Sequence, residues 1–365
     1  MADTKVFLSG GRIQGRSDDF TLASIPQTSW KELGRSTLSS AGDVLDSGTI
    51  AAKDNLMILV IGYKSGAAST EKLQFNADTG SNYAERHSEN GGNDSTSTSQ
   101  DHIELSIDGE DDEFTVLTVR NTANQEKLVI GHTIARQSGT GASNVPTRWE
   151  VVGKWANTSN QITRVQVTNP YGGDLDTGSE MVVLGCDDDE ADSGTNFWQE
   201  LADVDLSSGA ATTLSTGTIT AKKYLWVQGY SERNTSGTHQ PMVTFNDDAG
   251  SNYAVRRCNN GGSTGGGGED AEQAWGSQSK GIFAWRAGNK HYTNSYIFNT
   301  SSIEALMMID DTAFTTAGAS DGSPYRSENL TKWANTSDQI TSIKLSEQDG
   351  HTFDTQTSLR VWGSD

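Results

Sequence analysis

The segment Phe75-Asn-Ala-Asp-Thr-Gly-Ser-Asn-Tyr-Ala-Glu-Arg86 recurs later in the chain as Phe245-Asn-Asp-Asp-Ala-Gly-Ser-Asn-Tyr-Ala-Val-Arg256. A second pair of matching segments follows, Lys154-Trp-Ala-Asn-Thr-Ser-Asn-Gln-Ile-Thr163 and Lys332-Trp-Ala-Asn-Thr-Ser-Asp-Gln-Ile-Thr341. The same motifs in the same order indicate a tandem duplication of one domain. Each copy is about 160 residues long, which is an ordinary size for a single domain.

Matching edges divide the chain into four parts. Trp30-Lys-Glu-Leu33 corresponds to Trp198-Gln-Glu-Leu201, and Val183-Leu-Gly185 corresponds to Val361-Trp-Gly363. We therefore predict one copy over residues 30–185 and the other over residues 198–365. Residues 1–29 remain as a polar, extended N-terminal arm, and residues 186–197 as an acidic linker.

The hydrophobic pattern within each copy is that of β-strands. Residues 114–120 and 127–134 are rich in β-branched side chains, and apolar residues fall near every second position in 161–168 and 339–346. Clusters of Gly, Asn, Asp and Ser separate these runs, and no longer segment has a clear helical period. The sequence predicts an all-β protein with two tandem jelly-roll-like β-sandwiches, each of about eight strands.

Charge and composition exclude several classes of function. The 365 residues include 27 Lys plus Arg and 48 Asp plus Glu, a net charge of −21, which disfavours nucleic acid and anionic membranes as partners. No apolar run approaches the ~20 residues that span a bilayer, and no signal peptide is visible, so we expect synthesis in a cytoplasm. The 2 cysteines exclude a disulfide framework. We expect the acids to lie mainly in solvated loops and in the linker.

The Phe-Asn-x-Asp-x-Gly-Ser-Asn-Tyr motif has two interpretations. Its oxygen-bearing side chains are spaced like the start of a calcium loop, although the closing Glu of an EF-hand is missing. Alternatively it is the turn of a hairpin between strands that end at Phe75 and begin at Tyr83. The turn is favoured, and Ca²⁺ is the open alternative. The weak candidate ligands are Asn76, Asp78 and Asn82 in the first copy and Asn246, Asp248 and Asn252 in the second.

Tryptophan and tyrosine residues supply the other candidate sites. Trp155 and Trp333, in the Lys-Trp-Ala-Asn-Thr-Ser motifs, are interpreted as buried anchors at strand ends rather than as sugar platforms. A different group occurs where the second copy diverges from the first, and diverged loops commonly carry recognition. These candidate glycan-binding residues are Trp275, Trp285, Tyr292 and Tyr296.

Signatures of catalysis are missing from the sequence. The 6 His residues show no metal-ligand spacing, there is no Gly-x-Ser-x-Gly motif, and neither His nor Cys recurs at matching positions of the copies. The glycine-rich run 261–268 lacks the lysine of a phosphate loop. A carboxylate pair for polysaccharide cleavage stays open, because 48 acids offer many pairs. We predict a protein that is not an enzyme, with no resident cofactor.

Taken as a set, these motifs resemble virion structural proteins of tailed bacteriophages. The resemblance also includes Gly11-Arg-Ile-Gln-Gly15, Trp30-Lys-Glu-Leu-Gly-Arg35 and Glu126-Lys-Leu128, and it covers nearly the whole chain after residue 10. It implies a capsid decoration (cement) protein or a head fibre on the particle exterior, assembled in the host cytoplasm. The implied partners are capsid or other virion proteins and copies of itself, as a homotrimer. The alternative is a tail-fibre or receptor-binding module that recognises host surface glycans.

Overall fold

The computed structural model contains β-strands as its only regular elements within the described residues. The structure describes strands β1 (Phe7–Ser9) and β2 (Arg12–Gln14) and then residues 30–65, 71–106, 112–136, 139–170, 172–188, 196–234, 239–260, 272–285, 290–314, 324–348 and 350–365. No helix that could span a membrane occurs in these ranges. The all-β prediction is confirmed.

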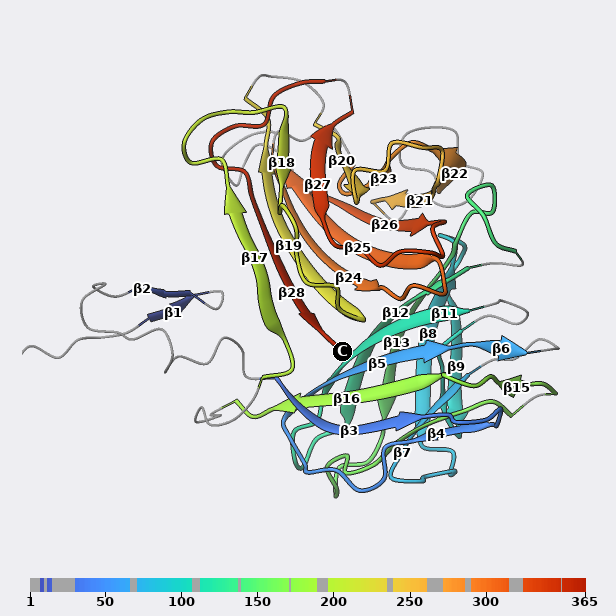
Figure 1. The fold of residues 1–365 in the computed structure, drawn as a ribbon. Coiled ribbons are helices and arrows are strands. Elements are labelled where there is room, and N and C mark those ends of the chain that lie inside the picture. The colour runs from blue at the N-terminus through green and yellow to red at the C-terminus, as the bar shows by residue number, and fades with distance from the viewer. Residues whose placement is uncertain are drawn as a thin grey trace, which may run out of the picture.

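The first copy is a sandwich of an eight-stranded and a four-stranded antiparallel sheet (Figure 1). The large sheet has the order β3 (Lys31–Thr37), β16 (Glu180–Cys186), β5 (Asn55–Gly62), β11 (Glu113–Arg120), β12 (Lys127–Ala135), β13 (Thr147–Trp155), β8 (Tyr83–Glu89) and β9 (Ser95–Gln100). The small sheet has the order β10 (Ile103–Glu104), β7 (Lys72–Phe75), β14 (Val165–Thr168) and β4 (Val44–Asp46). A short ribbon pairs β15 (Asp174–Leu175) with β6 (Lys64–Ser65).

The second copy repeats the two main sheets strand for strand. Its large sheet has the order β17 (Gln199–Asp205), β28 (Ser358–Ser364), β19 (Tyr224–Glu232), β24 (Lys290–Phe298), β25 (Ala305–Phe314), β26 (Tyr325–Trp333), β21 (Tyr253–Asn259) and β22 (Gln273–Gln278). Its small sheet has the order β18 (Thr213–Ser215), β27 (Ile343–Glu347), β20 (Pro241–Phe245) and β23 (Gly281–Ile282). Each sandwich therefore has twelve strands in its two main sheets, more than the eight expected. The short strands at turn-rich edges carry too little periodicity to be recognised from sequence.

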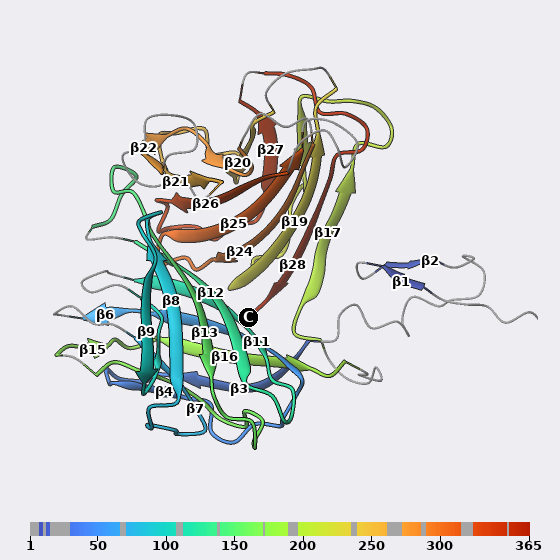
Figure 2. The ribbon, with the colours of Figure 1, turned by 180° about the vertical axis from the view of Figure 1, so that it is seen from behind.

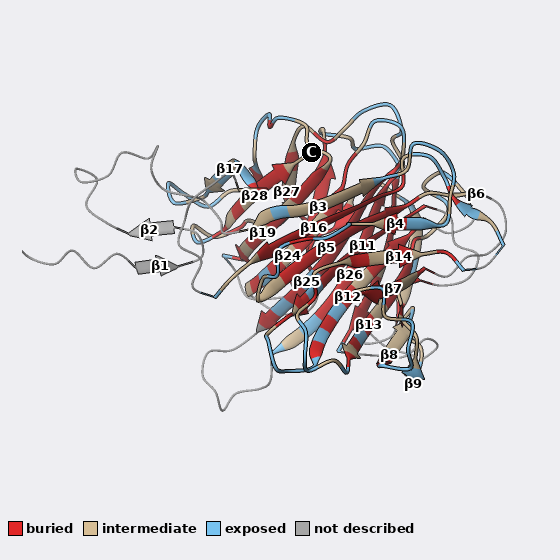
Figure 3. Ribbon diagram, turned by 90° about the horizontal axis from the view of Figure 1, so that it is seen from below, coloured by how far each residue is buried: buried red, intermediate tan, exposed pale blue. Residues whose placement is uncertain are grey.

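Strand β5 shows how the two copies are joined. Leu56, Ile58 and Val60 point into the core of the first sandwich. The alternate residues Met57, Leu59 and Ile61 lie in a second cluster, which the outer faces of the two large sheets form together. The central strands of both large sheets are accordingly buried, as the red ribbons of Figure 3 show. Burial on both faces explains the uninterrupted apolar run at residues 56–61.

Aromatic rings dominate the contact between the copies, where the two large sheets face each other (Figure 2). The Phe114 ring of the first copy lies 5.9 Å from Phe298 and 6.1 Å from Tyr224 of the second, measured between ring centroids. Glu180 of the first copy accepts hydrogen bonds from Tyr224 (2.8 Å) and Lys223 (2.9 Å) of the second. An apolar interface with satisfied polar groups is typical of a fixed association rather than of loosely tethered domains.

The arm and the linker are described only in part. Within residues 1–29, β1 and β2 pair as an antiparallel ribbon, and the remaining residues lie outside the described residues. In the linker, Asp187 pairs with Lys53 (2.8 Å) and Phe197 is buried against Trp198, while residues 189–195 lie outside the described residues. Part of the linker is thus fixed to the folded body.

The expectation that acidic residues lie mainly in solvated loops is wrong for a sizeable group. At least ten carboxylates are buried, and several of them pair with buried cations such as Lys64 and Arg148. Burial of a charge is tolerated where a partner or hydrogen bonds replace water. The buried acids are Glu71, Glu85, Asp112, Glu113, Glu180, Glu272, Glu304, Asp311, Glu328 and Glu347.

Candidate functional site

The loop between Phe75 and Tyr83 is a corner between two sheets, not the predicted hairpin. Strand β7 belongs to the small sheet and β8 to the large one, and the two do not pair with each other. Asn76 and Ala77 adopt left-handed backbone angles (φ 53° and 54°), which let the chain turn sharply. The hairpin prediction is wrong because Asn, Asp and Gly are equally suited to a hairpin turn and to a turn between two sheets.

Hydrogen bonds inside this corner engage the polar side chains proposed as calcium ligands. The Trp155 indole N–H donates to Asp78 Oδ2 (2.7 Å), and Asn82 Nδ2 and the Gly80 N–H donate to the same carboxylate. Asn76 Oδ1 accepts the N–H of Thr163 (2.8 Å). Burial raises the pKa of Asp78, but the bonds from Trp155, Gly80 and Asn82 outweigh it and hold the pKa below its usual value. This geometry favours the turn over a cation site.

The second copy reproduces the corner residue for residue. Trp333 donates to Asp248 Oδ2 (2.7 Å), Asn252 donates to both oxygens of Asp248, and Asn246 Oδ1 accepts the N–H of Thr341 (2.8 Å). Trp155 and Trp333 are almost completely buried at the ends of β13 and β26, which confirms their interpretation as anchors. The repeated motif is therefore a structural device.

The four glycan-binding candidates lie in two different parts of the second copy. Trp275 on β22 and Trp285 after β23 have ring centroids 6.2 Å apart, and the Arg257 guanidinium lies over both, 3.9 Å from the Trp285 centroid. They line a cavity of about 220 Å³. The other lining residues are Met242, Val255, Gln278, Lys280, Ile282 and Gln348.

Tyr292 and Tyr296 do not contribute to that cavity. Tyr296 stacks on Trp226 between the copies, where burial raises its pKa to about 12. Tyr292, four residues earlier on β24, is 50% exposed. The structure thus brings together Trp275 and Trp285 and separates both tyrosines from them.

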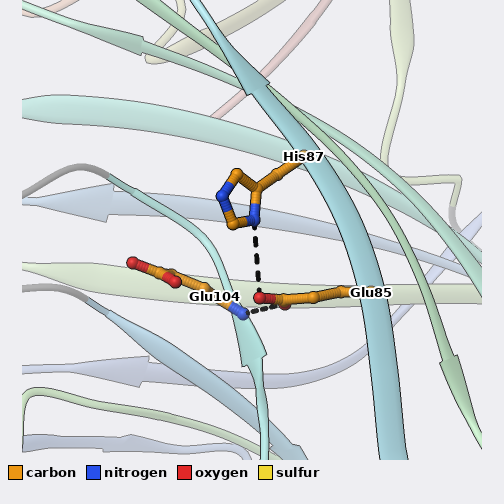
Figure 4. A group of neighbouring side chains, drawn as sticks. All are labelled: Glu85, His87 and Glu104. Carbon is orange, nitrogen blue, oxygen red and sulfur yellow. Dashed lines mark hydrogen bonds and ion pairs between the residues drawn. The ribbon is translucent and has the colours of Figure 1, made fainter. Parts of the chain in front are cut away.

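A cluster that the sequence analysis missed lies on the first copy. Glu85 and His87 on β8 and Glu104 on β10 each offer a ligand atom, and these atoms lie within 4.8 Å of one another (Figure 4). His87 Nδ1 is 3.5 Å from Glu85 Oε1, and the Glu104 N–H donates to Glu85 Oε2 (2.6 Å). Burial raises the pKa of Glu85 to about 7 and lowers that of His87. The available signal was Glu-x-His, since residues i and i+2 of a strand share a face.

This cluster and the Trp275–Trp285 cavity occupy the same position in the two copies. Tyr83 pairs with Trp155 as Tyr253 pairs with Trp333, so Val255 and Arg257 stand where Glu85 and His87 stand in the first copy. Ile282 likewise replaces Glu104, because Leu73 pairs with Ile103 as Val243 pairs with Gly281. One edge of the sandwich thus carries carboxylates and imidazole in one copy and an aromatic, apolar pocket in the other.

A buried polar network in the second copy has the residue types of a hydrolase triad. Ser231 Oγ lies 3.0 Å from His239 Nε2, and His239 Nδ1 contacts Glu347. All three residues are at most 2% exposed. A substrate carbonyl cannot reach Ser231 in this conformation, so the geometry does not support acyl transfer.

Charged side chains also line a groove between the copies. Two adjoining cavities of about 230 and 340 Å³ share Ile130 and His132. Beside them Arg148 is buried among Glu150 (3.0 Å), Glu272 (3.1 Å) and Glu328 (3.0 Å), the last two from the second copy. These ion pairs hold one wall of the groove together rather than leaving charges for a ligand.

Comparisons with known proteins add little. No family model and no curated protein matches the chain. Among solved structures, domains LG4-5 of the mouse laminin α1 chain match at 10% identity and a TM-score of 0.20, over 92% of this chain and 91% of that one. The LG1-3 region of the laminin α2 chain matches at 11% identity and a TM-score of 0.21, over 88% of this chain and 64% of that one. Likenesses this weak carry no argument about function.

Proposed function

We propose that the chain is a non-enzymatic structural protein on the exterior of a tailed-phage virion, as a capsid decoration (cement) protein or a head fibre. The observation that carries the proposal is that the two copies share the residues of their framework. The repeated Asp, Asn and Trp residues build the corner in both copies. At the sandwich edge, by contrast, Glu85, His87 and Glu104 of the first copy are replaced by Val255, Arg257 and Ile282 in the second. A domain duplicated for its shape retains its framework and not its surface chemistry.

The charge distribution supports an external position. Paired buried acids remove part of the charge from the surface, yet the chain as a whole carries −21. A surface of that sign is repelled by packaged DNA and is tolerated in salt on the outside of a particle. The proposed partners are capsid or other virion proteins, and the proposed assembly is a homotrimer.

The N-terminal arm provides the test. Particles are grown with full-length protein or with a variant lacking residues 1–29, and the protein retained on purified virions is quantified by mass spectrometry. If the arm anchors the protein, the deletion variant folds but is lost from the particles. Equal retention of both proteins would contradict anchoring by the arm, and absence of the full-length protein from virions would contradict the proposal itself.

A tail-fibre or receptor-binding role is the second candidate, and the Trp275–Trp285 cavity is the observation that favours it. Paired tryptophans beside polar side chains such as Gln278 and Lys280 are suited to stack on sugar rings and to bind their hydroxyl groups. Glycan-array binding by the full chain is compared with that of Trp275→Ala, with Tyr292→Ala as the control. Saturable binding lost only in Trp275→Ala supports glycan recognition, and no saturable binding by the native chain contradicts it.

A further inference from the structure

The Glu85–His87–Glu104 cluster lies where the large and small sheets of the first sandwich come together. Strand β8 supplies two of the side chains and strand β10 the third (Figure 4). The three side chains belong neither to the corner nor to the apolar clusters, although His87 packs on the core residue Trp149 and lines the groove between the copies. The role of the cluster is therefore not accounted for by the framework of the fold.

The imidazole of His87 is held in place and lacks a good partner. Its ring stacks on Trp149 with centroids 4.3 Å apart and an interplanar angle of 22°. The Nδ1 atom is buried without a hydrogen bond of acceptable geometry, and the nearest carboxylate oxygen, Glu85 Oε1, lies 3.5 Å away. A buried polar atom without a partner is uncommon and calls for an explanation.

The carboxylates supply the rest of a ligand set. The Glu85 side chain is only 2% exposed, and its second oxygen is oriented by the Glu104 N–H. Three ligand atoms within 4.8 Å of one another need only small side-chain rotations to reach a common ion at about 2.1 Å. One imidazole and two carboxylates suit Zn²⁺ and related first-row divalent ions better than Ca²⁺, which prefers oxygen ligands alone.

We propose that Glu85, His87 and Glu104 bind a divalent first-row transition-metal ion of the zinc class. The ion would join β8 of the large sheet to β10 of the small sheet, at the sandwich edge. Such a bridge is specific to the first copy, because Val255, Arg257 and Ile282 occupy the matching positions of the second and offer no ligand. The inference is independent of the proposed virion role.

The test uses the full chain without tags, after a chelator has removed bound metal. Zn²⁺ is then titrated into the protein, and the heat of binding is measured by calorimetry. We expect one saturable site per chain, and a shift of the thermal unfolding midpoint to higher temperature on adding Zn²⁺. His87→Gln and Glu104→Gln should each weaken binding on the order of 100-fold. His351→Ala removes an imidazole elsewhere in the second copy and should leave binding unchanged. Co²⁺ should give a visible absorption band that His87→Gln loses.

Glu104→Gln is expected to fold normally, because it replaces a partly exposed side chain by one of equal size. Weaker Zn²⁺ binding by this variant therefore reports on the ligand and not on misfolding. Circular dichroism of each apo variant establishes that it is folded before titration. Absence of saturable Zn²⁺ binding by the native chain would overturn the proposal. So would binding that both glutamine variants retain, or that His351→Ala removes.

Discussion

The two copies share a corner and differ at an edge. At the corner, Asp78 and Asp248 accept the indole N–H of Trp155 and Trp333 at the same distance of 2.7 Å. At the edge, the first copy has the Glu85–His87–Glu104 cluster where the second copy has the cavity lined by Trp275 and Trp285. The corner joins the two sheets, so every change there disturbs both, whereas side chains at the sheet edge are free to change without loss of fold.

The largest expected effect comes from removing the anchors of the corner. Trp155→Ala or Trp333→Ala leaves a large cavity and should lower the free energy of unfolding by about 3–5 kcal/mol. Equilibrium denaturation of the two variants measures this cost in each copy. If the corners are equivalent, the two losses agree within about 1 kcal/mol. A loss of stability in only one of the two variants would show that the corners are not equivalent.

A smaller effect is expected between the copies, on strand β24. Tyr296→Ala removes a ring stacked on Trp226 and should cost about 3 kcal/mol. Tyr292→Ala is the matched control, because its half-exposed ring should cost less than about 0.5 kcal/mol. Thermal and chemical denaturation of both variants gives the difference. Equal costs would show that the stacked Tyr296 ring contributes little to stability.

The carboxylate of the corner should matter less than its tryptophan. Asp78→Ala or Asp248→Ala leaves a buried indole N–H without an acceptor and should cost about 2 kcal/mol at neutral pH. Because the pKa of Asp78 is lowered in the folded state, its contribution is complete above the unfolded pKa and is lost as the pH falls through the folded value. The stability difference between native and variant proteins should therefore begin to shrink as the pH falls below about 4. A difference that is independent of pH would contradict this role of the charge.

The sequence was sufficient for the duplication, the all-β class and the buried tryptophans, because each leaves a local pattern. It was not sufficient for the corner, since the residues of a hairpin turn and of a turn between sheets are the same. Buried acids such as Glu180 were missed because their partners, Lys223 and Tyr224, are distant in sequence. The edge cluster was missed because Glu104 reaches it from β10 of the small sheet, whereas Glu-x-His indicates only the two residues on β8 of the large sheet.

The location of the protein on intact particles tests the central claim most directly. Electron cryo-microscopy of virions, with antibody labelling of this chain, is the measurement. The account predicts density for two joined β-sandwiches on the outer surface of the capsid, labelled on the outside of closed heads. Purified particles that lack the chain, or that carry it only inside the head with the DNA, would contradict the account.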